Sequence, residues 1–155
     1  MSESTIVQNV YLFKGLNSDE LALVSKIIKV KTFNAGDNIF EHDDMASALY
    51  IVKFGSVSIH QKTESGEKIE VTVLGTGSHF GEMAFIDEER RSASATAIEK
   101  TDILIINYDD LTTLLKRQLT IAIHFYKALS HFLCGRLRLT TTDLSFAREK
   151  NLSHF

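Results

Sequence analysis

The chain has 155 residues, of which 44% are hydrophobic and 24% charged, and its formal net charge is −3. This size and balance are typical of one globular domain, and they give no general attraction to nucleic acid. No apolar run reaches the roughly 18 residues of a membrane span, and the first residues lack the pattern of a signal peptide. The one cysteine, Cys134, cannot form an internal disulfide. We therefore expect a cytoplasmic protein.

Residues from about 5 to 30 follow a helical pattern. Asn17, with Glu20 three residues later, is typical of a capping box at the start of a helix. Leu21 and Val24 then recur at helical spacing. The sequence therefore predicts a helical N-terminal segment.

Residues from about 31 to 107 show short strands separated by turns. Six of the eight glycines lie between Gly36 and Gly81, at positions 36, 55, 66, 75, 77 and 81. Apolar and polar residues alternate between these turns, which is typical of strands with one buried face. Strands are expected at 38–40, 49–53, 57–61, 69–74, 93–97 and 103–107. This spacing predicts a small antiparallel β-barrel or jelly roll.

Residues from about 108 to 150 return to a helical pattern, so the fold class is α+β or mainly β, with one domain over 1–155. The last helix carries a 4-3-4-3 spacing that is typical of a coiled-coil seam. This seam either packs on the chain's own barrel or pairs with a second copy. Its residues are Leu133, Leu137, Thr140, Leu144 and Ala147.

The segment FGEMAFIDEERRSASATA, from Phe80 to Ala97, combines an acid, an arginine and small residues. Gly81 allows a close backbone approach to a ligand. Arg91 can direct two donors at a phosphate. Glu82 would repel a bare phosphate, but it suits a ligand that also carries a hydroxyl group. A sugar phosphate meets both requirements.

Other phosphate and metal motifs are absent from the sequence. Gly75, Gly77 and Gly81 are spaced one residue too widely for the dinucleotide fingerprint, and no P-loop pattern occurs. The six histidines show no metal-ligand spacing, and His79, beside the loop, is interpreted as structural. No nucleophile elbow occurs either, so we expect a chain that is not an enzyme and has no metal or cofactor.

The segment from Phe80 to Ala93 resembles the phosphate-binding cassette of the cyclic nucleotide-binding domain family, and the resemblance extends over about residues 10–140. It implies that Glu82 accepts a hydrogen bond from the ribose 2′-hydroxyl and that Arg91 clamps the cyclic phosphate. The other site residues that it implies are Gly81, Met83, Ala84, Ser92 and Ala93 in the cassette, and Thr140 and Thr141 near the base.

The resemblance implies a stand-alone receptor for cAMP, or for cGMP, that signals to an unidentified protein effector through its C-terminal helix. A homodimer through that helix is a further expectation. Direct DNA binding is not expected, because the transcription activators of this family carry a helix-turn-helix domain after the long helix, and this chain ends at Phe155. The alternative is a protein-interaction module that keeps the fold and has lost the nucleotide.

Overall fold

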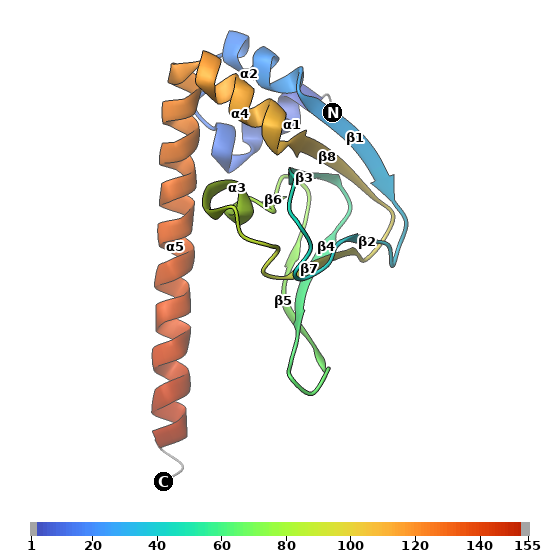
Figure 1. The fold of residues 1–155 in the computed structure, drawn as a ribbon, viewed down its shortest axis with the longest axis vertical. Helices are drawn as coiled ribbons and strands as arrows, with labels where there is room; N and C mark the ends of the chain where they lie inside the picture. Colours follow the sequence, from blue (N-terminus) through green and yellow to red (C-terminus); the bar gives the residue numbers. More distant parts are fainter. Residues whose placement is uncertain (1–2, 153–155) are drawn as a thin grey trace.

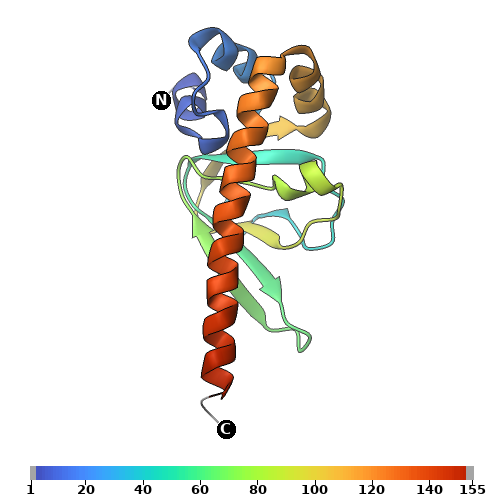
Figure 2. The same ribbon diagram turned by 90° about the vertical axis from the view of Figure 1, so that its left-hand side faces the viewer.

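A computed structural model describes residues 3–152. It shows a sandwich of two β-sheets, a group of short helices at one end, and one long helix along the side (Figure 1). Turning the molecule by 90° shows that the long helix crosses the sandwich and extends past the tip of the β-hairpin at the far end (Figure 2).

The N-terminal segment forms three short helices instead of one: α1 (Glu3–Asn9), the 3-10 helix η1 (Tyr11–Phe13) and α2 (Ser18–Ser25). The predicted capping box of α2 is confirmed. The Glu20 amide donates to the Asn17 side chain over 2.9 Å, and the Asn17 amide donates to the Glu20 carboxylate over 3.0 Å. Residues 28–30, which the sequence assigned to the helical segment, begin the first strand.

Each sheet has four antiparallel strands. The first has the order β1-β8-β3-β6, with β1 Ile28–Phe33, β8 Thr101–Asn107, β3 Ala48–Phe54 and β6 His79–Phe80. The second has the order β2-β7-β4-β5, with β2 Asn38–Phe40, β7 Ser94–Ala97, β4 Val57–Lys62 and β5 Lys68–Leu74. The predicted jelly-roll-like antiparallel fold with flanking helices is confirmed, but the sheets do not close into a barrel.

Two hydrophobic clusters hold these layers together. One lies between the two sheets and includes Phe33, Val52 and Ile103. The larger one joins the first sheet to the helices and includes Phe13, Ile106 and Phe125. The helices are therefore fixed to the sheet at the end where the long helix begins.

The C-terminal segment forms α4 (Tyr108–Arg117) and the long helix α5 (Leu119–Leu152). Asn107 caps α4 by accepting a hydrogen bond from the Asp109 amide over 2.8 Å. The first half of α5 packs through Ile121, Phe125 and Leu129, whereas every residue from 134 to 150 is exposed. Within residues 3–152, no helix is both long enough and apolar enough to cross a membrane.

Candidate functional site

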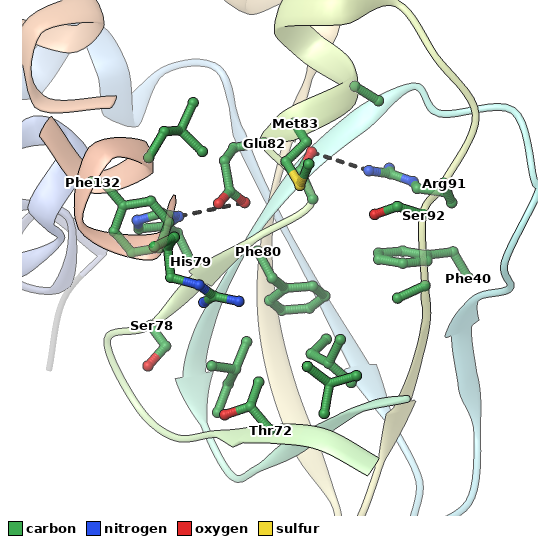
Figure 3. Close-up of a pocket in the computed structure, with 18 of the residues that line it drawn as sticks. Phe40, Thr72, Ser78, His79, Phe80, Glu82, Met83, Arg91, Ser92 and Phe132 are labelled. Carbon is green, nitrogen blue, oxygen red and sulfur yellow. Dashed lines mark hydrogen bonds and ion pairs between the residues drawn. The ribbon is translucent and has the colours of Figure 1, made fainter. Parts of the chain in front are cut away.

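A cavity of about 720 Å³ lies between the second sheet, the segment from β6 to β7, and α5 (Figure 3). This volume lies in the range of small-molecule sites. The short helix α3 (Met83–Asp87) forms part of its wall, and Thr140 lines it from α5. The segment Phe80–Ala93 is thus brought against a helix that begins about thirty residues later in the sequence.

Arg91 is the central cation of this cavity, and only 5% of its surface is exposed. Its Nη1 donates to the Gly81 carbonyl over 3.0 Å and to the Tyr108 hydroxyl over 3.1 Å. Its Nη2 donates to the Ala48 carbonyl over 2.7 Å, whereas Nε has no hydrogen-bond partner. All of these acceptors are neutral, and no carboxylate among the described residues forms an ion pair with Arg91. A buried charge without a counter-charge is costly, so this arrangement favours an anion in the cavity.

Aromatic rings surround the guanidinium of Arg91. Its central carbon lies 4.2 Å from the centre of the Phe40 ring, 5.5 Å from that of Tyr50 and 5.7 Å from that of Tyr108. Such ring faces attract a cation without neutralising its charge. Burial raises the pKa of the Tyr108 phenol above its ordinary value, although Arg91 acts in the opposite direction. Tyr108 therefore keeps its proton, which it donates to the Gly81 carbonyl.

Position 81 needs a glycine because the guanidinium of Arg91 lies directly against it. Its φ is +78°, and an added Cβ would lie 2.8 Å from Nη1 of Arg91 and 3.1 Å from Cδ2 of Tyr50. A side chain at this position would displace the guanidinium, so glycine sets the place of the arginine.

Backbone hydrogen bonds fix the rest of the loop. The Arg91 amide donates to the Asp44 carbonyl over 2.9 Å, and the Asp43 amide donates to the Arg91 carbonyl over 2.8 Å. The Gln61 side chain donates to the Ser92 carbonyl over 2.9 Å. The cation is therefore positioned before any ligand is present, which lowers the entropic cost of binding.

Glu82 lies at the start of α3 and is 8% exposed. Its carboxylate lies 3.7 Å from Nδ1 of His79. The His79 ring in turn contacts Phe132 of α5, with 4.5 Å between the ring centres. Figure 3 shows this group on the α5 side of the cavity, opposite Arg91 and Phe40. The site thus presents an acid and a cation that are not paired with each other.

Comparison with known proteins identifies the family. The family model for the cyclic nucleotide-binding domain matches residues 30–118, which is more than half of the chain. The chain belongs to the cyclic nucleotide-binding domain family. The family is one of regulatory nucleotide-binding domains and not of catalytic domains.

Named relatives agree with this assignment. The chain is 35% identical to the cyclic AMP receptor protein of Thermus thermophilus over 143 residues, which cover 90% of the chain and 64% of that relative. The crystal structure of the catabolite activator protein of Thermus thermophilus superposes with a TM-score of 0.79 at 34% identity, covering 88% of this chain and 62% of that one. The regulatory domain of Toxoplasma gondii PKA, solved with cAMP, superposes with a TM-score of 0.67 at 26% identity. The superposition covers 72% of this chain and 42% of that one. The chain therefore spans less than two thirds of the length of these proteins.

The cyclic nucleotide-binding fold brings eight of the nine predicted site residues to the cavity wall. These are Gly81, Glu82, Met83, Ala84, Arg91, Ser92, Ala93 and Thr140. Thr141 is not among the described residues that line the cavity, and its hydroxyl donates to the Leu137 carbonyl over 2.8 Å. The Thr140 hydroxyl donates to the Arg136 carbonyl over 2.9 Å.

The sequence did not indicate the residues that hold Arg91 and Glu82 in place. Phe40, Ala48 and Tyr108 surround Arg91 from distant parts of the chain, and Phe132 reaches His79 from α5. Only His79 carried a signal, as a polar residue directly before the Phe80-Gly81-Glu82 motif. Within residues 3–152, no group of three or more His, Cys, Asp or Glu side chains is arranged to hold a metal ion.

Proposed function

We propose that the chain is a receptor for a cyclic 3′,5′-nucleotide, with cAMP preferred, and that it does not turn the ligand over. The observation that carries this proposal is Arg91, a buried cation that lines a large cavity with no carboxylate partner among the described residues. A cyclic phosphate supplies one negative charge and oxygens that can accept hydrogen bonds from the guanidinium.

The position of Glu82 supports a ribose next to that phosphate. A buried carboxylate repels a phosphate, so it favours binding only if it accepts a hydrogen bond from the ligand. The ribose 2′-hydroxyl of a cyclic nucleotide lies on the sugar carbon next to the cyclic phosphate and supplies this donor. The preference for cAMP rests on the relatives whose names include cyclic AMP.

We infer that α5 reports binding. Its Thr140 lines the cavity, while the helix around it is exposed, so a ligand that contacts Thr140 changes the stability of a helix that packs weakly on its own domain. Exposed apolar residues of α5 follow a heptad-like spacing, with steps of four and three at its start and a step of seven near its end, and they suit either an α5 helix of a second copy or a protein effector. They include Leu119, Ile123, Tyr126, Leu137 and Leu144.

The proposal includes a cytoplasmic location and no direct contact with DNA. The free and exposed Cys134 suits a reducing compartment. The alternative function is a protein-interaction module of the same fold that binds no nucleotide.

Calorimetric titration with cAMP, cGMP and AMP tests the proposal. We expect saturable binding of cAMP, weaker binding of cGMP, and little binding of AMP, whose phosphate is not cyclic. At about 100 times the dissociation constant, cAMP should stabilise the folded chain by about 2.7 kcal/mol. No heat of binding and no change in stability with either cyclic nucleotide would favour the interaction module. Sedimentation of the same samples measures whether the chain dimerises.

A further inference from the structure

His79 occupies a position that an apolar side chain could fill. Its side chain is 4% exposed, it lies in the two-residue strand β6, and its neighbour across the sheet is Ile51 of β3. Its ring contacts Phe132 edge-on, with 63° between the two ring planes. These contacts alone do not need an imidazole.

The polar atom of His79 points at the acid of the site. Nδ1 is buried and has no hydrogen-bond partner among the described residues, and it lies 3.7 Å from Oε2 of Glu82. This separation is too long for a good hydrogen bond but lies within the limit of about 4 Å for an ion pair. An imidazolium at this position would pair with the Glu82 carboxylate, which lines the cavity.

We propose that His79 is a positioning residue of the nucleotide site and takes up a proton when the nucleotide binds. The protonated ring, held against Phe132, pairs with Glu82, so the carboxylate keeps its orientation toward the ribose hydroxyl beside a negatively charged phosphate. Binding and proton uptake favour each other equally, because the coupling between two binding events is reciprocal. This inference rests on the proposed binding of a cyclic nucleotide.

The surrounding charges favour this coupling. Besides His79, the described cavity wall carries three carboxylates and three guanidinium groups, so the added phosphate makes the balance negative and favours an imidazolium. The ring of Tyr11 in η1, which is hydrogen-bonded to His131 of α5 over 2.6 Å, also lies near Phe132, with 6.3 Å between the ring centres. The charged groups of the wall are Glu82, Asp87, Glu89, Arg90, Arg91 and Arg136.

Titration of the whole chain with cAMP at pH 6 and pH 8 tests this inference. Each titration is run in two buffers with different ionisation enthalpies, since the difference in heat counts the protons taken up. The variants are His79→Gln, which keeps a polar side chain, His79→Phe, which keeps an aromatic ring, and the control His131→Gln, which removes an exposed histidine of α5. Circular dichroism checks that each variant is folded.

We expect the wild type and His131→Gln to bind cAMP about threefold to tenfold more tightly at pH 6 than at pH 8, with net proton uptake. Both His79 variants should bind without proton uptake and with little pH dependence, and with a smaller preference for cAMP over 2′-deoxy-cAMP. Proton uptake that persists in both His79 variants, or binding by the wild type without proton uptake, would overturn the role of His79 and leave the proposed function intact. No binding at either pH would overturn both.

Discussion

Gly81→Ala is the substitution that most directly tests how the arginine of the site is positioned. The new Cβ would lie 2.8 Å from Nη1 of Arg91, closer than such atoms approach in folded proteins, and 3.1 Å from the Tyr50 ring. Nη1 is the atom that donates to both the Gly81 carbonyl and the Tyr108 hydroxyl. The substitution should therefore displace a charged donor from two acceptors.

Two costs add to the loss of stability. An alanine at a φ of +78° is strained by about 1–2 kcal/mol. Weakening a hydrogen bond made by a buried charged group costs about 1.5–3 kcal/mol more. We expect the free energy of unfolding to fall by about 2.5–5 kcal/mol, and the affinity for cAMP to fall at least about tenfold, which corresponds to about 1.4 kcal/mol.

Gly36→Ala is the matched control, because Gly36 has a φ of +88° and nothing lies within 4 Å of an added Cβ. It should show the backbone strain alone and bind cAMP like the wild type. Since the chain contains no tryptophan, unfolding in urea is best followed by circular dichroism and binding by calorimetry. If Gly81→Ala is no less stable than Gly36→Ala and binds equally well, the close approach of Gly81 to Arg91 does not position the arginine.

Three further substitutions test separate contacts. Glu82→Ala should weaken the binding of cAMP by about tenfold to a hundredfold, because it removes a charge-assisted hydrogen bond. It should weaken the binding of 2′-deoxy-cAMP much less, since that ligand lacks the hydroxyl group. Equal losses of affinity for the two ligands in calorimetric titrations would refute the ribose contact. Tyr108→Phe should make stability less sensitive to alkali. Burial raises the pKa of this phenol in the folded chain. Its contribution to the free energy of unfolding is therefore present below the pKa of an unfolded tyrosine and is lost as the pH rises through the pKa of the folded state. Urea unfolding at about pH 9 and pH 11 measures this, and an unchanged dependence would contradict it. Gly55→Ala should destabilise the fold by about 1–3 kcal/mol more than Gly66→Ala, because only the first Cβ would meet Thr101, at 2.4 Å from its Oγ1; equal unfolding midpoints would rule out this contact.

The parts of the fold that depend on local chemistry could be predicted from the sequence. The capping box at Asn17 needs only two side chains three residues apart, and strand β2 was predicted with its observed bounds. The two-residue strand β6 was missed because it is too short to show alternation. The sequence left a closed barrel and a jelly roll as alternatives, because alternation within a strand does not specify which strands pair.

At the site, too, the residues that are close in sequence could be predicted and the contacts between distant residues could not. Gly81, Glu82 and Arg91 lie within eleven residues of one another, so their spacing could be compared with a family pattern. The groups that hold Arg91 come from β2, β3 and the start of α4, and nothing in the sequence links those positions. The prediction for α5 rested on a still finer detail, since Thr140 and Thr141 differ by about 100° around a helix, and the rotation of α5 over the cavity decides which of them lines it.

The central claim is that Arg91 binds the cyclic phosphate of a nucleotide, and titration of cAMP into the wild type and Arg91→Ala at one pH and salt concentration tests it most directly. Loss of one partner of a buried charge pair costs about 2–5 kcal/mol, so the dissociation constant should rise by about 30-fold to several thousand-fold. The same affinity in a folded Arg91→Ala variant would contradict the claim.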